Sequence, residues 1–421
     1  MGASIQSVLA EGFTCPVRDV LWGHVYFTPE LLALTDSAPF MRLHRILQLG
    51  PVHRIYPGAT HTRASHSIGV YHLGRRLLQN LAERGADWMS GEGAMSFLCA
   101  CLLHDLGHFP YTHSLKELPL RPHESLTGDI ILADPVKGLV AGCGADPELT
   151  AAIVDDGRDR GEGGSVELLF YRRLLSGCLD PDKLDYLNRD ARYCGVPYGM
   201  QDVDFILSRL VPNVERGADI DSRLIPNVEA ILFAKYLMYR TVYWHRQVRA
   251  CTAMIKKALI GALELGDVTG EELYGLDDWS LFDLLRRKTG SALAEAVWKG
   301  RLFSVAAEIP YDDADHACLR DISRRSLYER RLAAELGVGL GPGDLIIDLP
   351  EPVSFEAGLF VLDENRDFAD GTSAFKAETL ESFVRTLYTV RIFVEPDFCG
   401  KVETLPRLCN ILYGKKDWLR I

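Results

Sequence analysis

The first part of the chain has the hydrophobic periodicity of helices. Apolar residues recur at three- and four-residue spacing over about 31–49, 67–84 and 93–106. The third segment is apolar nearly all round, which predicts that this helix is buried.

Two further helices are predicted downstream. Asp180 is a favourable N-cap, the proline that follows it suits a first helical turn, and Gly195 can end the helix. The longest helical signal runs from about 226 to 265 and ends at Gly266.

The pattern changes after residue 266. Short helical segments reach about 336, and a glycine-rich break follows at 337–343. Three strand-like runs then occur, DLIIDLP, GLFVLD and VRIFVEP, with a helix at about 376–388 between the last two. The chain is therefore predicted to be mainly α, with an all-α domain at 1–265 and a smaller α+β region at 266–421.

Composition excludes several classes of protein. The 421 residues are 47% hydrophobic and 25% charged, which is typical of a folded globular chain long enough for two domains. A net charge of -12 disfavours a broad nucleic-acid or anionic-membrane surface. We find neither a secretion signal nor a run of about 20 apolar residues, so we expect a cytoplasmic protein without membrane attachment.

Histidines are concentrated in one region, because eight of the twelve lie between positions 53 and 123. His104 and Asp105 end the buried apolar helix, His66 lies near a helix start, and Asp182 lies in the first turn of its helix. Two imidazoles and two carboxylates would suit manganese, iron, zinc or nickel. A histidine at a helix end is more often a cap or a surface residue, so spacing alone leaves both interpretations equally open.

The order of several motifs indicates a family. DSAPFMRLHRILQLG, HTRASHSIGVYHLG, LLHDLGHFPYTH, LDPDKLDYLNRDA and KYLMYRTVYWHR occur in this order along the chain. From about 17 to 255 the chain resembles the HD-superfamily phosphohydrolases, in particular the deoxynucleoside triphosphate triphosphohydrolases, and the C-terminal third resembles them only loosely. The resemblance implies an HD-domain helical core at about 50–195.

The resemblance also implies a reaction. His66, His104, Asp105 and Asp182 would ligate one divalent transition metal. A dNTP would be hydrolysed at its α-phosphorus to a deoxynucleoside and triphosphate, by water that the metal activates. Magnesium would accompany the substrate phosphates.

Catalytic histidines are implied in the same way. His108 matches the general acid of the family or its relay, and His123, next to Glu124, matches a second catalytic position. Histidine suits this role because its unperturbed pKa of ~6.5 permits proton donation near neutrality. The alternative for His123 is a surface loop residue.

A triphosphate requires local cations in an acidic protein. The candidates are Arg63, Lys183, Lys235 and Arg246. By resemblance, Lys183, Tyr186 and Asp190 contact phosphate and sugar, an aromatic ring at C2′ disfavours a ribose hydroxyl, and Gln48 and Leu49 lie beside the sugar. On the predicted long helix, one face carries Lys235, Tyr239, Val242, Tyr243 and Arg246. For Tyr239, a packing role and a substrate wall are equally open.

The chain departs from the family pattern at several positions. In the substrate site, Tyr239 replaces a phosphate-contacting histidine, Lys235 replaces an arginine, and Lys116 replaces an active-site aspartate. In the nucleotide activator site that some members have, Arg18, Met41 and His44 differ from the family residues. The nucleotide that serves as substrate, and whether a nucleotide activates the protein, are therefore left open.

The resemblance further implies a nucleotide activator and a homo-oligomer, either dimer or tetramer. The rival functions are a 5′-nucleotidase, a cyclic-dinucleotide or guanosine tetraphosphate hydrolase, and a catalytically silent nucleotide-binding scaffold.

Overall fold

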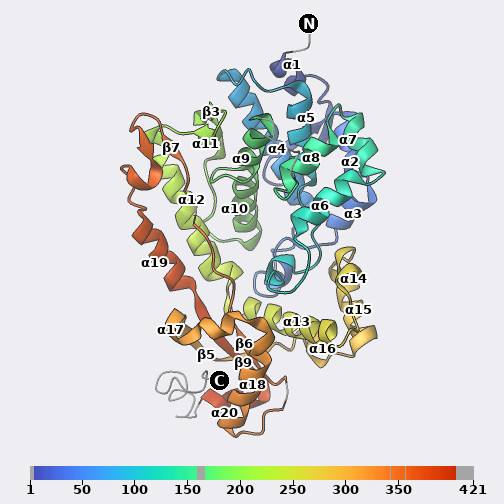
Figure 1. The fold of residues 1–421 in the computed structure, drawn as a ribbon, viewed down its shortest axis with the longest axis vertical. Helices are drawn as coiled ribbons and strands as arrows, with labels where there is room; N and C mark the ends of the chain where they lie inside the picture. Colours follow the sequence, from blue (N-terminus) through green and yellow to red (C-terminus); the bar gives the residue numbers. More distant parts are fainter. Residues whose placement is uncertain (1–3, 159–165, 342, 356, 404–421) are drawn as a thin grey trace.

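A computed structural model describes residues 4–158, 166–341, 343–355 and 357–403. Helices make up most of these residues, and the strands form only small sheets, so the predicted mainly α fold is confirmed (Figure 1). None of the described helices has both the length and the apolar character needed to cross a bilayer.

The N-terminal part consists of helices packed around α4 (Arg63–Glu83), α5 (Gly91–Leu103) and α10 (Pro181–Cys194). The surrounding helices are α1 (Ile5–Ala10), α2 (Pro29–Thr35), α3 (Ala38–Leu43), α6 (His123–Leu132), α7 (Val136–Gly142), α8 (Pro147–Val154), α9 (Val166–Leu175) and α11 (Val203–Arg209). Short 3-10 segments occur at η1 (Gly50–Arg54), η2 (Thr112–Ser114) and η3 (Ser222–Leu224).

The predicted helix signals of this part are confirmed for α4, α5 and α10. The Asp180 side chain accepts a hydrogen bond from Lys183 N at 2.6 Å, and Gly195 ends α10 with a φ of 67°. These are the N-cap and C-cap that the sequence predicts for this helix.

Other local predictions are wrong. The single helix expected at 31–49 is two short helices, α2 and α3, because the chain breaks at Asp36 and Ser37 and restarts with Pro39 in the first turn. Two hairpins also occur where only helices were expected, formed by β1 (Cys15–Asp19) with β2 (Gly23–Phe27) and by β3 (Val211–Asn213) with β4 (Gly217–Asp219).

The long helix expected at 226–265 is also interrupted. It consists of α12 (Ile225–Met238), a π-helical turn, η4 (Tyr239–Tyr243), and α13 (Arg246–Glu264). Trp244 leaves the helical path, and His245 begins α13 by accepting a hydrogen bond from Gln247 N at 3.3 Å. A π turn changes the direction of the residues that follow it, so the face predicted to run from Lys235 to Arg246 does not continue past the turn.

The C-terminal part is built on a three-stranded antiparallel sheet with the order β5-β9-β6. Its strands and hairpins are β5 (Ser304–Pro310), β6 (Leu345–Asp348), β7 (Phe360–Val361), β8 (Arg366–Asp367) and β9 (Thr389–Val394). Its helices are α14 (Gly270–Tyr274), α15 (Asp278–Thr289), α16 (Ala292–Trp298), α17 (Asp313–His316), η5 (Ala317–Arg320), α18 (Ile322–Leu336), η6 (Phe368–Asp370), α19 (Ala377–Leu387) and α20 (Pro396–Glu403). The three predicted strand runs and the helix between the last two are confirmed, whereas β5 was not predicted.

The two parts are in contact over α13. This helix packs against α16, β5 and β6 of the C-terminal part and lies below the N-terminal helices in Figure 1. On the other side of the molecule, α19 lies along α12, and Phe383 stacks on Tyr236 with ring centroids 4.5 Å apart.

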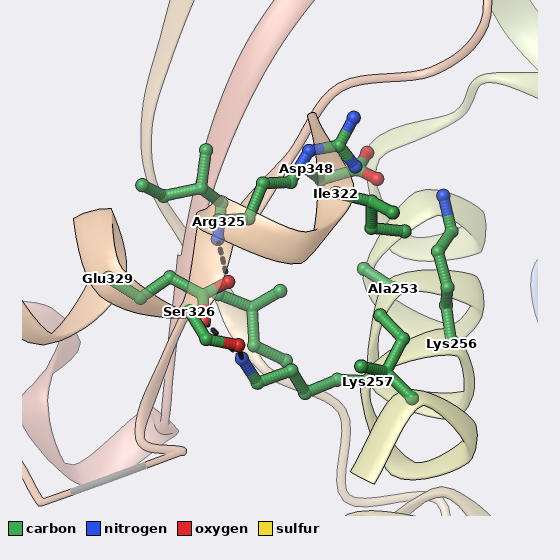
Figure 2. Close-up of a pocket in the computed structure, with 11 residues that line it drawn as sticks. Ala253, Lys256, Lys257, Ile322, Arg325, Ser326, Glu329 and Asp348 are labelled. Atoms are coloured by element: carbon green, nitrogen blue, oxygen red, sulfur yellow. Dashed lines mark hydrogen bonds and ion pairs between the residues drawn. The ribbon is translucent and has the colours of Figure 1, made fainter. Parts of the chain in front are cut away.

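Buried ion pairs join α13 to the C-terminal elements. Arg249 donates to both carboxylate oxygens of Asp348, at 2.9 and 2.6 Å. Figure 2 shows Lys257 of α13 directed at Ser326 and Glu329 of α18, with the Ser326 contact at 2.6 Å. Arg249 and Asp348 are both buried, so this pair depends on the presence of both partners, whereas Lys257 is only partly buried against the buried Glu329.

We predict that Asp348→Ala destabilises the protein by about 3–5 kcal/mol, because it leaves the buried Arg249 guanidinium without a counter-ion. Urea denaturation should show a lower midpoint. Asp283→Ala, which removes an exposed partner of Arg287, is the control and should leave the midpoint unchanged. Equal midpoints for the two variants would contradict the importance of the buried pair.

Candidate functional site

Three of the predicted metal ligands come together where α4, α5 and α10 meet. Donor atoms of His66, His104 and Asp182 all lie within 4.8 Å of one another. His66 is in the first turn of α4, His104 is the C-cap of α5, and Asp182 is in the first turn of α10. The distance between His66 Nε2 and Asp182 Oδ1 is 2.9 Å.

Asp105, the fourth predicted ligand, lies beside this group. Its Oδ1 is 3.3 Å from His104 Nε2, and its Oδ2 accepts a hydrogen bond from Arg63 Nη1 at 2.8 Å. Two imidazole nitrogens and one carboxylate lie within 4.8 Å of one another, and a second carboxylate lies next to them. Together they form a mixed donor set that fits a divalent transition metal. The four residues therefore have the chemistry that the predicted cofactor requires.

Local hydrogen bonds turn the His104 ring toward the group. Its Nδ1 lies 3.0 Å from Cys101 O, one turn back in α5, so its Nε2 faces Asp105 and Asp182. This is the usual arrangement of a metal-binding histidine, in which the second ring nitrogen is fixed by a backbone or carboxylate oxygen.

The electrostatics of this group depend on close ionic contacts. Burial disfavours the His66 imidazolium, yet the hydrogen bonds with Asp182 and Asp185 outweigh it and raise the pKa of His66 to about 10. Burial opposes ionisation of Asp182 as well, but the contact with His66 lowers its pKa to about 2. Without a metal, His66 is therefore protonated and paired with the ionised Asp182, and metal binding must displace this proton.

A second cluster of imidazoles lies next to the first. Ring nitrogens of His108, His113 and His123 lie within 4.8 Å of one another, so their spacing would also admit a metal. His108 Nε2 is 3.2 Å from His113 Nε2, and the rings of His108 and His123 have centroids 3.8 Å apart. His123 begins α6 and is not a loop residue.

Close packing and carboxylates position this cluster. A Cβ at Gly107 would lie 2.1 Å from His123 O, so only glycine permits this approach of the loop to α6. His108 Nδ1 is 3.1 Å from Asp105 Oδ1, and His123 Nδ1 is 3.1 Å from Glu124 Oε2. Burial, together with neighbouring positive groups, lowers the pKa of His108 well below its usual value and that of His123 to about 2.

Both clusters face a cavity of about 540 Å³. Most of the predicted site residues line it, namely Gln48, Leu49, Arg63, His66, His104, Asp105, His108, His123, Asp182, Tyr186, Asp190, Lys235, Tyr239 and Tyr243. Three predicted residues do not line it. The Lys183 ammonium bonds the Asp180 carboxylate at 2.6 Å, Glu124 lies behind His123, and Arg246 is exposed beyond the π turn.

Some polar groups at the cavity are satisfied within the protein and others are not. Asp190 is fixed on both oxygens, with His61 Nε2 at 2.8 Å and the Tyr243 hydroxyl donating at 2.6 Å. Gln48 Oε1 and Arg63 Nε are buried and have no hydrogen-bond partner among the described residues. Unpaired buried polar groups are costly, so these two atoms are suited to contact a bound ligand.

Sequence reasoning missed several residues of the site. The structure adds His61, His113, Trp244, Arg249 and the segment 350–354 to the cavity or its supports. His113 stands within the HDLGHFPYTH motif and could have been found there. Segment 350–354 comes from the C-terminal part, where Ser354 O accepts from Lys235 Nζ at 2.6 Å, and no local pattern indicated it.

Two family models, both of HD-type proteins, match this chain. The HD domain family matches residues 63–139, and the HD associated region matches residues 207–403. The uncharacterized protein YwfO of Bacillus subtilis is 32% identical over 59% of this chain and 56% of its own length. The deoxynucleoside triphosphate triphosphohydrolase SAMHD1 of Homo sapiens is 27% identical over 60% of this chain and 45% of its own length.

This chain thus matches only about half the length of these curated relatives. A solved phosphohydrolase structure from Bacteroides thetaiotaomicron superimposes with a TM-score of 0.69 at 22% identity, covering 90% of this chain and 99% of its own. A hypothetical protein from Aquifex aeolicus has the same TM-score at 24% identity, covering 93% and 99%. At these identities the two structures establish the fold.

We predict that His104→Ala and Asp182→Ala each abolish binding of a tightly held divalent metal, because each removes a donor from the group on α4, α5 and α10. His108→Ala should keep that metal, since its ring belongs to the second cluster. Elemental analysis of the purified variants measures the metal content per chain. Equal metal loss in all three variants would contradict the division into two clusters. Two ions per wild-type chain would indicate that each of the two clusters binds one ion.

Proposed function

Because this chain belongs to the HD superfamily, we propose that it is a metal-dependent phosphohydrolase that cleaves a dNTP into deoxynucleoside and triphosphate. The observation that carries the proposal is the convergence of His66, His104, Asp105 and Asp182 on one wall of a cavity large enough for a nucleotide. The similarity to SAMHD1 supports the choice of a dNTP.

The bound metal would polarise a phosphate oxygen and lower the pKa of water toward neutrality. The protein's own residues provide orientation. Arg63 is fixed through Nη1 by Asp105, so its unpartnered Nε has a defined direction for an anionic oxygen. Lys116 and Lys235 also line the cavity and add positive charge for the rest of the polyphosphate.

His108 and His123 are proposed to handle the proton for the leaving 5′ oxygen. In the free protein both rings are neutral near pH 7, because burial and nearby positive groups lower their pKa values. A bound triphosphate would favour the imidazolium form, since an adjacent negative charge raises a histidine pKa. Substrate binding would therefore protonate a histidine that can then donate this proton to the leaving group. Glu124 would hold the His123 ring in place through Nδ1.

The part of the cavity wall that continues along α10 suits a deoxyribose. Tyr186, on the same face of α10 as Asp182, presents an aromatic ring, and Asp190 is held in place by His61 and Tyr243. Gln48 lies two residues before the η1 turn. Its buried Oε1 is a hydrogen-bond acceptor that has no partner among the described residues. An aromatic wall at C2′ would exclude an added hydroxyl by steric contact and loss of its hydration.

Other parts of the proposal concern organisation. A domain boundary near 265 would follow the end of α13 at Glu264. We also propose a homo-oligomer and activation by a nucleotide, as the family resemblance implies, and a cytoplasmic location, as expected from the sequence.

The substrate class is tested by incubating the purified protein with Mn²⁺ and each dNTP in turn. We expect nucleoside and tripolyphosphate in equal amounts, resolved by anion-exchange chromatography. His108→Ala should retain the metal and lose about 100-fold or more in turnover, as expected for loss of an acid catalyst. Orthophosphate released from a nucleoside monophosphate would instead indicate a 5′-nucleotidase, and no hydrolysis of any nucleotide by metal-loaded protein would favour the scaffold.

Tyr186→Ala is predicted to weaken discrimination against ribonucleotides by about 10-fold or more, because it opens space beside C2′. The ratio of kcat/KM for a dNTP and the matching ribonucleotide measures this effect. Tyr26→Ala, at an exposed position on β2, is the control. An unchanged ratio in Tyr186→Ala would remove the steric explanation.

A further inference from the structure

A second carboxylate of α10 lies behind the metal-binding group. Asp185 Oδ2 is 2.8 Å from His66 Nδ1, on the side of the ring opposite Asp182. Both Asp185 and His66 are buried. When the His66 Nδ1–H donates to Asp185, the Nε2 lone pair points toward Asp182 and the metal-binding group.

Arg189 fixes the Asp185 carboxylate one helical turn further along α10. Its Nε donates to Asp185 Oδ2 at 2.8 Å and its Nη2 to Asp185 Oδ1 at 2.9 Å. The side chains of Arg189 and Asp185 are both fully buried. This bidentate pairing leaves the carboxylate a single orientation.

The network continues into the turn between β1 and β2. Arg189 Nη1 donates to Asp19 Oδ2 at 2.9 Å, and Asp19 Oδ1 accepts from Leu21 N at 2.8 Å and from Trp22 N at 3.0 Å. From the same turn, Trp22 Nε1 donates to Asp185 Oδ1 at 2.6 Å. The hairpin therefore contacts Asp185 directly through Trp22 and indirectly through Asp19 and Arg189.

The opposing helix leaves room for this network at one position. A Cβ on Gly69 of α4 would lie 1.9 Å from Asp185 Oδ1 and 2.5 Å from Arg189 Nη2. Real Cβ atoms do not approach other atoms so closely, so any side chain at this position would displace the pair. Gly69 lies within the same α4 helix as His66, and its lack of a side chain places Asp185 against the His66 ring.

We propose that Asp185 is a positioning residue that sets the metal affinity of His66, and that the β1–β2 turn holds Asp185 in place through Trp22 and the Asp19–Arg189 pair. The carboxylate selects the His66 tautomer that can bind metal through Nε2 and restrains the ring. Loss of such a partner typically weakens metal binding about 10–100-fold. The inference rests on the metal site of the proposed function and is independent of the nucleotide that the protein cleaves.

A purely structural role for the network predicts a different outcome. Replacing Asp185 would then lower the stability of the metal-free protein and leave the affinity for metal unchanged. A positioning role predicts a weaker affinity, and therefore a smaller increase in Tm when metal is added. The two roles are separated by measuring the metal-free Tm and the metal affinity of the same variant.

The experiment compares full-length Asp185→Asn and Trp22→Phe with the wild type in the absence of nucleotide. Asp185→Asn keeps the shape but places an amide next to Arg189, whereas Trp22→Phe removes one donor to Asp185. Asp219→Asn is the matched control, because Asp219 is buried and paired with Arg216 but contacts none of the four ligands. Mn²⁺ affinity is measured by chelator competition, and the Co²⁺ visible spectrum reports the ligand geometry.

We expect Asp185→Asn to weaken Mn²⁺ binding about 10–100-fold and to change the Co²⁺ spectrum. Trp22→Phe should weaken binding by a smaller factor, and Asp219→Asn should match the wild type in both measurements. Wild-type affinity and spectrum in a folded Asp185→Asn variant would overturn the inference. If that variant does not fold, unchanged affinity in Trp22→Phe overturns it.

The outcomes distinguish this inference from the proposed function. If the wild type binds metal but cleaves no nucleotide, the proposed function fails, and weaker metal binding in Asp185→Asn still supports the inference. If the wild type binds no divalent transition metal, the inference fails as well, because His66 then has no ion to be positioned for.

Discussion

The site exists because each charged group buried at the meeting point of α4, α5 and α10 has a partner of opposite charge. His66 lies between the carboxylates of Asp182 and Asp185, and Asp105 is held by Arg63. An isolated charge in this environment would be neutralised or would destabilise the fold. The buried arginines therefore permit several carboxylates to stay ionised close together, which is the state that a metal ligand requires.

The two imidazole clusters differ in charge although they are neighbours. Carboxylates on both sides stabilise the His66 imidazolium, whereas His108 and His123 are kept neutral by burial and by neighbouring positive groups, including Arg63. The first cluster thus suits a cation, and the imidazoles of the second cluster are neutral in the free protein. A substrate that combines a metal-bound phosphate with an adjacent leaving group matches this division.

The C-terminal part contributes residues to the cavity wall. Segment 350–354 forms part of the cavity wall, and the Arg249–Asp348 pair ties α13 to β6 just before that segment. Arg249 also lines the cavity, so its pairing with Asp348 links the position of β6 to the shape of the cavity. The match of the HD associated region to residues 207–403 covers these elements.

The sequence by itself determined the features that depend on local signals. The caps and hydrophobic period of α10, the apolar run of α5 and the HD motifs located the four proposed ligands. The structure brings donor atoms of His66, His104 and Asp182 together and places Asp105 beside them. Strand runs in the C-terminal part were likewise visible as short β-rich segments. Each of these signals is contained within a few consecutive residues, where backbone propensity and side-chain period act directly.

Only the tertiary structure decided which distant residues pair. The partnership of Asp185 with the β1–β2 turn and the wall at 350–354 both arise from contacts between segments far apart in the sequence. Nothing local distinguishes Asp185 from a solvent-exposed aspartate on a polar helix face. Its role follows from burial against His66 and Arg189, and burial is set by how the helices pack.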